Sequence, residues 1–206
     1  MPNIKENIVI VLGETGVGKS SFINAITGKN ECFVSSKGIA CTNDIKFVST
    51  SILYNLFVFV DTHGLNDGKG DEKNISKIKE ATSKFPRIQN ILILLKFTDN
   101  RLTNSLKSSL KEFMRCFPTK NFWKHVLIVR TFAKRDEDFE EEKNNIKGQF
   151  LNSIFEDDHK DLLEFMKENH IEVPKEIQEF FVDSKKKDEQ TKVEFINIFN
   201  SINKAQ

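Results

Sequence analysis

The chain has 206 residues, of which 30% are charged and 38% hydrophobic, and its 31 basic and 30 acidic side chains leave a formal net charge of +1. This length is sufficient to bury a core without disulfides or structural metals. The near balance of charge disfavours a nucleic-acid-binding protein, which usually carries a basic excess on one face. Three cysteines without metal-ligand spacing disfavour a disulfide framework and favour a reducing compartment, so we expect a cytoplasmic protein.

The termini and the apolar runs give no sign of membrane insertion. No apolar run approaches the roughly 20 residues that span a bilayer. Residues Met1–Asn3 show neither a signal peptide nor a myristoylation glycine, and Asn203–Gln206 contain no prenylation cysteine. We therefore expect no intrinsic membrane anchor, while peripheral association with a membrane stays open. Because we find no linker and no repeat, we predict a single domain over residues 1–206.

The first predicted elements surround a phosphate-binding motif. Ile8–Leu12 is a short apolar run typical of a buried parallel strand, and Ser21–Thr27 is predicted to begin a helix. Between them, GETGVGKS fits the pattern G-x-x-x-x-G-K-[ST]. A glycine-rich turn before a helix N-terminus directs backbone N–H groups and the positive end of the helix dipole at one point, which binds phosphate. The expected nucleotide-binding residues here are Gly13, Glu14, Thr15, Gly16, Val17, Gly18, Lys19, Ser20 and Ser21.

Three side chains or backbone groups near this loop have specific predicted roles. Lys19 would reach the β- and γ-phosphates, and the Ser20 hydroxyl would ligate magnesium. Asp61 ends the apolar run Leu56–Val60, where a carboxylate beside the phosphate loop would hold magnesium, usually through water. Gly64, three residues later, would donate its backbone N–H to the γ-phosphate in a loop that moves with hydrolysis. Together these motifs predict a guanine-nucleotide switch domain.

The loop that follows is predicted to be a mobile switch region. Leu65–Asn74 is polar and contains two glycines. In Ras-like GTPases a glutamine at the position of Leu65 orients the attacking water, and leucine cannot do so. Either hydrolysis is slow, or another group orients water, or a partner supplies the chemistry. His63 could act on water, or it is simply the variable residue of the turn.

The remaining pattern alternates strands and helices. A polar strand at Asp44–Val48 is predicted to pair with Leu56–Val60 through a turn at Ser49–Leu53. Apolar strands follow at Ile91–Leu95, Val126–Val129 and Phe180–Val182. Helical periodicity recurs over residues 102–114, 146–155 and 195–202, and the charged stretch Lys134–Lys147 is predicted to be a solvated helix with its approach loop. We therefore predict an α/β fold, with a doubly wound, mostly parallel six-stranded sheet that has one antiparallel edge strand and helices on both faces, as a three-layer sandwich.

The segments GETGVGKSSFINAI, DTHGLND and KFTDNRLTNSLKSSLKEFMRCFPTKNFWKHVLIVRT resemble the avirulence-induced-gene (AIG) type GTPases. This family is also called the immune-associated nucleotide-binding proteins or GTPases of immunity-associated proteins (GIMAP). It is septin-like and related to the chloroplast import receptors. The resemblance covers Ile8 to Thr131. It implies a G domain that binds GTP or GDP with Mg²⁺, forms a homodimer or larger oligomer across the nucleotide face, and acts on an effector that the sequence does not identify.

The most specific part of the resemblance is the segment Asn100–Thr103, which is similar to the family's G-R-[FY]-T element. Arg101 matches the arginine of that element. We hypothesise that it reaches across a two-fold dimer and stabilises transition-state charge in the partner site. The alternative is a helix-start arginine that makes a surface ion pair.

The sequence departs from the family at several positions. His63 replaces the proline of the family's D-T-P-G motif. Thr42 is the best candidate for the switch threonine that closes on magnesium, with a simple loop threonine as the alternative. The base-recognition motif, N-K-x-D in Ras-type domains and often T-x-K-x-D-like in this family, is irregular here. The residues predicted to form the base site are Thr131 at the opening position, Phe132 against the base face, Asp136 or alternatively Asp138 as acceptor from guanine, and the segment Val182 to Ser184 as backbone donors.

Three functional hypotheses follow. The first is a GTPase switch. The second is a phosphate-loop kinase or ATPase, which the chain's lack of an arginine-rich lid disfavours. The third is a nucleotide-stabilised scaffold with little turnover, which Leu65 keeps open.

Overall fold

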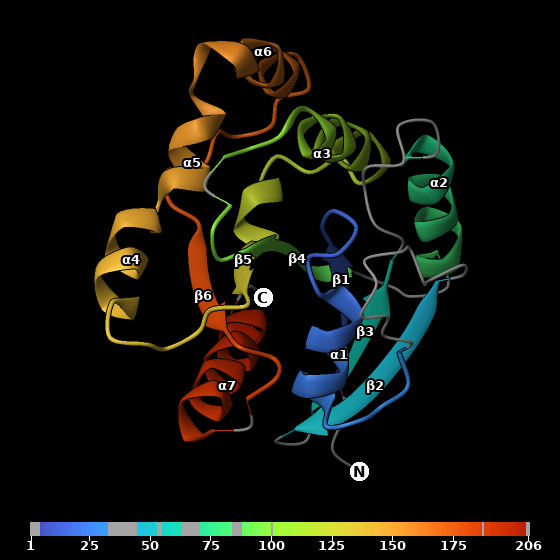
Figure 1. The fold of residues 1–206 in the computed structure, drawn as a ribbon. Coiled ribbons are helices and arrows are strands. Elements are labelled where there is room, and N and C mark those ends of the chain that lie inside the picture. The colour runs from blue at the N-terminus through green and yellow to red at the C-terminus, as the bar shows by residue number, and fades with distance from the viewer. Residues whose placement is uncertain are drawn as a thin grey trace.

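The computed structural model describes residues 5–32, 45–52, 55–62, 71–83, 88–99, 101–186 and 188–204. Strands and helices alternate along the chain (Figure 1). Their order is β1 (Lys5–Leu12), α1 (Lys19–Thr27), β2 (Lys46–Ile52), β3 (Asn55–Asp61), α2 (Asp71–Thr82), β4 (Ile88–Lys96), α3 (Asn104–Cys116), η1 (Phe122–His125), β5 (Val126–Thr131), α4 (Phe139–Ile146), α5 (Gln149–Ile154), η2 (Asp157–His159), α6 (Lys160–Glu168), β6 (Gln178–Val182) and α7 (Glu189–Lys204).

The strands form one six-stranded sheet in the order β2-β3-β1-β4-β5-β6. β2 is antiparallel to β3, and every other neighbouring pair is parallel. This confirms the predicted doubly wound sheet with an antiparallel edge strand. The carboxyl ends of the five parallel strands lie at one edge, which is where ligands bind in folds of this kind.

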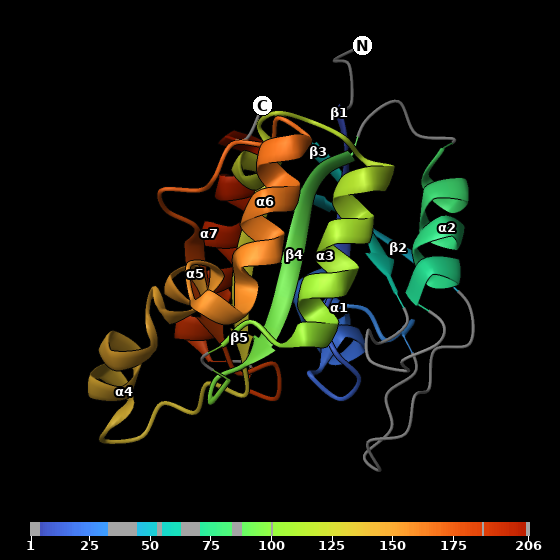
Figure 2. The ribbon, with the colours of Figure 1, turned by 90° about the horizontal axis from the view of Figure 1, so that it is seen from above.

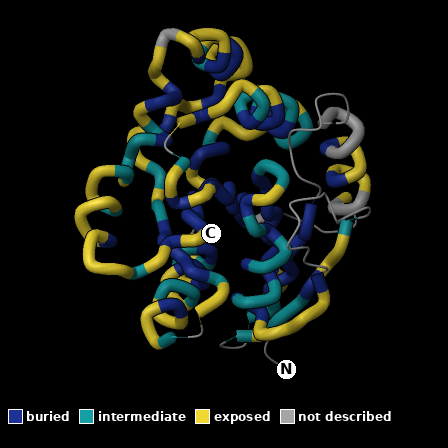
Figure 3. Tube along the Cα trace, in the orientation of Figure 1, coloured by how far each residue is buried: buried dark blue, intermediate teal, exposed yellow. Residues whose placement is uncertain are grey.

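Helices cover both faces of the sheet because successive residues of each buried strand point to opposite sides. On one face, Ile8 and Ile10 of β1 share a core with apolar residues of α2, α3, α5 and α6. On the other face, Val9 and Val11 share a second core with residues of α1 and α7. Figure 1 shows α3 and α6 above the strands and α7 below them, and Figure 2 is the view from above, with α3 and α6 towards the viewer. Figure 3 shows the buried strands enclosed by exposed outer helix surfaces. The strands are thus held rigidly from both sides.

The structure corrects three details of the sequence prediction. β2 continues through Ile52, paired with Asn55, so the turn does not begin at Ser49. α2 begins at Asp71, inside the region predicted to be a loop up to Asn74. The periodic stretch 146–155 is not one helix, because α4 ends at Ile146 and Gly148 adopts a left-handed conformation with φ 81° before α5.

Two of the three cysteines, Cys32 and Cys116, are free thiols, and Cys41 lies outside the described residues. Within the described segments, every helix is too short or too polar to cross a bilayer.

Candidate functional site

The turn between β1 and α1 is built around a close approach to β4. A Cβ atom on Gly13 would lie 2.6 Å from the Leu94 carbonyl oxygen and 2.9 Å from a methyl carbon of Val17, so only glycine fits. Gly18 precedes α1 with φ 90°, a conformation that L side chains rarely adopt, and the first turn of α1 contains no acidic residue. The helix N-terminus therefore faces the turn with its positive dipole end uncompensated by a carboxylate of that turn.

Lys19 lies along this turn. Its side chain is buried, and its ammonium group donates to the carbonyl oxygens of Gly13 (2.9 Å) and Glu14 (3.0 Å). The Thr15 hydroxyl is also buried, without a hydrogen-bond partner in the described part of the chain. The structure brings the predicted residues Gly13 to Ser21 together as one loop and helix start, while their contacts with a nucleotide stay a prediction.

Ser20 and Asp61 meet as the sequence predicts. The Ser20 hydroxyl donates to Asp61 Oδ2 over 2.8 Å. The Asp61 side chain is buried, and its other oxygen, Oδ1, has no hydrogen-bond partner among the described residues. A hydroxyl and a carboxylate with a free oxygen are the hard oxygen ligands that Mg²⁺ prefers, so these residues fit the predicted metal.

The buried thiol of Cys32 is a neighbour of this pair that the sequence did not indicate. Burial raises the pKa of the Asp61 carboxyl above its ordinary value, and hydrogen bonds from Ser20 and Cys32 oppose that rise. Burial, together with the Asp61 charge, raises the pKa of the Cys32 thiol to about 12, so the thiol stays protonated and can donate. Asn24 fixes Cys32 by pairing with its backbone N–H and carbonyl, each over 2.8 Å.

The end of β5 is tied to the phosphate-binding loop by Thr131. The buried Thr131 hydroxyl lies 2.6 Å from the Val17 carbonyl oxygen and 3.0 Å from that of Leu95. Phe132 follows with φ 57°, is 42% exposed, and lies over the loop, where its ring would be 3.4 Å from a Cβ atom on Gly18. Thr131 therefore shapes the loop, and Phe132 places an aromatic face beside it.

The other predicted base-site residues lie at the same edge or on the approach to α4. Val182 pairs with Thr131 across the sheet, and its carbonyl accepts from the Ala133 N–H (3.3 Å). The Ser184 hydroxyl is buried without a partner among the described residues. Asp136 and Asp138 are both exposed, and Asp138 is the N-cap residue of α4. In the described part of the chain, no hydrogen bond or ion pair links either carboxylate to Thr131, whose hydroxyl contacts the Val17 and Leu95 carbonyls.

Arg101 lies in the segment that joins β4 to α3, at the same edge of the sheet. Its side chain is exposed, and the described part of the chain offers it no hydrogen bond or ion pair. The predicted residues Thr42, His63 and Gly64 lie outside the described residues.

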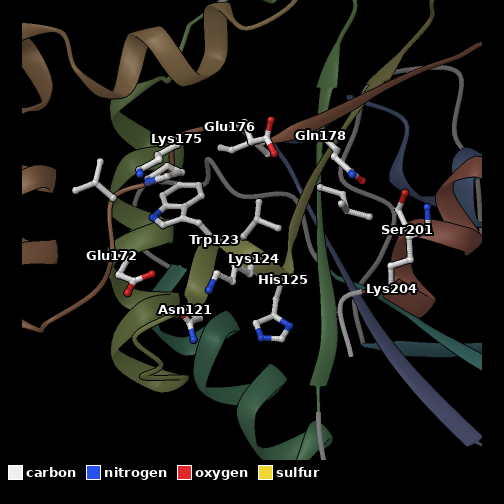
Figure 4. A pocket seen from close by; sticks show the side chains of 15 residues that line it. Asn121, Trp123, Lys124, His125, Glu172, Lys175, Glu176, Gln178, Ser201 and Lys204 are labelled. Carbon is white, nitrogen blue, oxygen red and sulfur yellow. The ribbon is translucent and has the colours of Figure 1, made fainter.

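A separate groove of about 800 Å³ opens at the other end of the sheet (Figure 4). Its walls include Trp123 and His125 of η1, Gln178 at the start of β6, and Lys204 at the end of α7. None of the predicted site residues lines this groove. Because it sits where the strands begin, it is distinct from the phosphate-binding edge.

Fold and site together define a phosphate-loop nucleotide-binding domain of the doubly wound α/β class. Residues 8–131, more than half of the chain, match the family model described as "50S ribosome-binding GTPase". The chain therefore belongs to this GTPase family.

Several known proteins are similar to the chain. "GTP-binding protein A" of Dictyostelium discoideum is 30% identical over 128 residues, which cover 61% of this chain and 28% of that protein. "GTPase IMAP family member 8" of Rattus norvegicus is 27% identical over 154 residues, which cover 71% of this chain and 22% of that protein. The chain thus spans less than a third of the length of these curated relatives.

Among solved structures, that of Toc33 from Arabidopsis thaliana with Mg²⁺ and GMPPNP has a TM-score of 0.71 at 18% identity, covering 98% of this chain and 85% of that one. Another structure has a TM-score of 0.69 at 19% identity and covers 98% of this chain and 84% of that one. It is described by the statement that dimerisation is important for the GTPase activity of the chloroplast translocon components atToc33 and psToc159. At these identities the likeness concerns the fold.

Proposed function

We propose that this chain is a guanine-nucleotide switch that binds GTP and GDP with Mg²⁺ and hydrolyses GTP slowly as a monomer. The observation that carries the proposal is the contact of the Ser20 hydroxyl with the buried Asp61 carboxylate, directly after the loop that holds Lys19. In a GTPase of this kind the protein positions the phosphates and stabilises charge, while water is the nucleophile. Membership of a GTPase family supports this reading over a kinase or ATPase.

Each residue of the site then has a role. The loop N–H groups and Lys19 bind the phosphates, and Ser20 and Asp61 hold the magnesium, with Thr42 proposed as a further ligand. Bound Mg²⁺ would neutralise charge on the β- and γ-phosphates. Gly64 would donate its N–H to the γ-phosphate. His63 is a candidate for orienting the attacking water, with a simple turn residue as the alternative.

Guanine recognition is proposed to rest on the ends of β5 and β6. Thr131 holds the loop, Phe132 stacks on the base, and the segment Val182 to Ser184 supplies backbone donors. Asp136 is the proposed acceptor of the guanine N–H groups, with Asp138, the N-cap residue of α4, as the alternative. If so, Asp136→Asn should lower GTP affinity and raise affinity for xanthosine triphosphate, since an acceptor becomes a donor. An unchanged preference would leave Asp138 or the backbone alone as the base reader.

We further propose that two copies pair across the nucleotide face and that Arg101 enters the partner's site. An exposed arginine without a described partner, beside the phosphate loop, is free to do so. The structural neighbour whose dimerisation is described as important for its GTPase activity supports this. The AIG-type subfamily and a cytoplasmic location, with peripheral membrane association as the alternative, belong to the same proposal.

A concentration series of GTP hydrolysis tests the pairing. Turnover per molecule should rise as dimer forms, and Arg101→Ala should remove the rise. An arginine that enters a partner's site can increase the rate of hydrolysis by roughly 10³-fold or more. GDP affinity measured by calorimetry on the same variant separates lost chemistry from lost binding. Flat turnover over a range in which sedimentation shows dimer would favour instead the nucleotide-stabilised scaffold that Leu65 suggests.

A further inference from the structure

The segment between β4 and α3, residues 97–103, is held at several points on both sides of Arg101. We name it the Arg101 loop; the structure describes all of it except Asn100. On one side of Arg101, the Asp99 carbonyl accepts from a guanidinium nitrogen of Arg130. On the other side, the Leu102 N–H donates to the Ser153 hydroxyl of α5 over 2.9 Å. Arg101 therefore lies between two residues, Asp99 and Leu102, whose backbone groups are held by hydrogen bonds.

The anchor before Arg101 is a buried ion pair. Arg130 of β5 and Glu179 of β6 approach to 3.1 Å with side-chain exposures of 0% and 2%. Glu179 also accepts from the Gly148 N–H over 2.8 Å. Burying two charges is unfavourable unless their polar atoms form hydrogen bonds. The Arg130 guanidinium forms one of these bonds with the Asp99 carbonyl. This end of the Arg101 loop is therefore attached to the β5–β6 pair at one side of the sheet.

After Arg101 there is, besides the Leu102–Ser153 bond, a second contact that connects the Arg101 loop to the phosphate-binding loop. The Thr103 hydroxyl donates to Glu14 Oε1 over 2.5 Å, a short bond of the kind expected for a carboxylate acceptor. The Glu14 backbone carbonyl accepts in turn from Lys19 (3.0 Å). Phosphates that bind the Lys19 ammonium group would compete with the Glu14 carbonyl for its hydrogen bond. Glu14 contacts both Lys19 and Thr103, so a shift of Glu14 on nucleotide binding would alter the position of Thr103.

We infer that the Glu14–Thr103 hydrogen bond couples the phosphate-binding loop to the Arg101 loop, so that Glu14 and Thr103 are positioning residues for Arg101. Nucleotide at the phosphate loop then sets how Arg101 is presented to the partner subunit. The role of Arg101 rests on the proposed function, whereas the coupling between the two loops is measurable without it.

Thr103 also accepts from the Leu106 N–H (3.2 Å) as the N-cap of α3, so the test must keep the cap and remove only the bond to Glu14. Thr103→Asp does this, because aspartate is a good N-cap but cannot donate when ionised and carries the same charge as Glu14. Thr103→Ser keeps both functions. In the double variant Thr103→Asp with Glu14→Gln, the amide can donate to the new carboxylate and restore the bond with its direction reversed.

The experiment is hydrogen exchange of the backbone amides of the Arg101 loop, in the full chain, with GDP and with a non-hydrolysable GTP analogue. Wild type should show exchange that depends on the nucleotide, by about tenfold if one charge-assisted bond carries the coupling. Thr103→Asp should lose this dependence, Thr103→Ser should keep it, and the double variant should regain it. Ser108→Ala removes an exposed hydroxyl of α3 that bonds only within its helix and should behave as wild type.

Two results would overturn the coupling: the same exchange in wild type with both nucleotides, or a Thr103→Asp response equal to that of wild type. A melting temperature for each variant reports whether the cap of α3 has survived. Arg101→Ala, assayed in the concentration series, tests the proposed function separately. If that variant keeps its concentration-dependent turnover while the exchange results hold, the coupling stands and the role of Arg101 fails.

Discussion

Replacing Thr131 by valine should weaken nucleotide binding, because the Thr131 hydroxyl contacts a carbonyl of the phosphate-binding loop. Thr131 is 2% exposed and its hydroxyl lies 2.6 Å from the Val17 carbonyl oxygen, so valine would leave a buried carbonyl of the phosphate loop without this donor. A lost hydrogen bond together with an unsatisfied buried acceptor costs about 1–3 kcal/mol. If the loop relaxes away from its binding conformation to recover part of that energy, GDP affinity should fall by about tenfold.

Calorimetric titration of GDP, with thermal unfolding in parallel, measures both consequences. Thr131→Ser restores the hydroxyl and should recover wild-type affinity. Thr27→Val is the matched control: its hydroxyl makes a bond of the same length, 2.6 Å to the Ile23 carbonyl, at the last residue of α1. That change should leave GDP affinity intact. If Thr131→Val binds GDP within about twofold of wild type while losing stability, Thr131 does not shape the loop and the reasoning is wrong.

Three further changes test separate parts of the structure. Lys19→Ala removes the cation expected at the β- and γ-phosphates and should weaken GDP binding well beyond tenfold, or about 1.4 kcal/mol; a calorimetric affinity equal to wild type would refute the phosphate-loop assignment. Asp61→Asn removes a buried charge whose pKa is raised by burial, so the nucleotide-free protein should melt at a higher temperature at neutral pH, while the gain in melting temperature from adding Mg²⁺ to the GDP complex should disappear. Asp161→Asn should destabilise the protein at pH 7 by less than about 1 kcal/mol, since the Asp161 side chain that pairs with Lys111 and Lys107 is 52% exposed. Because hydrogen bonds from these lysines lower its folded pKa to about 2, the difference between Asp161→Asn and wild type should shrink as pH falls from about 4 to about 2; denaturant titrations that show a constant difference would contradict the assignment.

The five parallel strands were predictable because each contains a short apolar run that is buried between the two helical layers. β2 was placed less well, because among its residues only Val48 is buried, and an edge strand with one buried face gives a weak pattern. α2 was missed for a related reason: its described buried residues are Ile75 and Ile78 alone, in an otherwise polar sequence. α6, which was not predicted, has a clear apolar stripe at Leu162, Phe165 and Met166, a pattern that is visible in the sequence.

At the site, the local motifs were predictable and the connections between them were not. Gly13 to Ser20 is contiguous, and Asp61 is the last residue of β3, which pairs with β1, so parallel topology alone brings Ser20 and Asp61 together. By contrast, Glu14 and Thr103 are 89 positions apart, and no periodicity relates a carboxylate in one loop to a hydroxyl in another. Such a bond depends on how α3 packs on the sheet, which only the assembled tertiary structure determines.

The predicted base-recognition motif is irregular at the end of β5, where Thr131 contacts the phosphate loop and the chain turns at Phe132. In the N-K-x-D pattern an acceptor stands three residues after the asparagine, yet the third residue after Thr131 is Lys134. Phe132 lies between them with φ 57°, a conformation that costs a non-glycine residue on the order of 1 kcal/mol or more. The buried Ala133, bonded to the Val182 carbonyl, and the bond from the Lys134 N–H to the Phe132 carbonyl hold it there. The strained turn keeps the Phe132 ring over the phosphate loop, and because it redirects the chain after Thr131, the position of the acceptor cannot be found by counting residues from the motif.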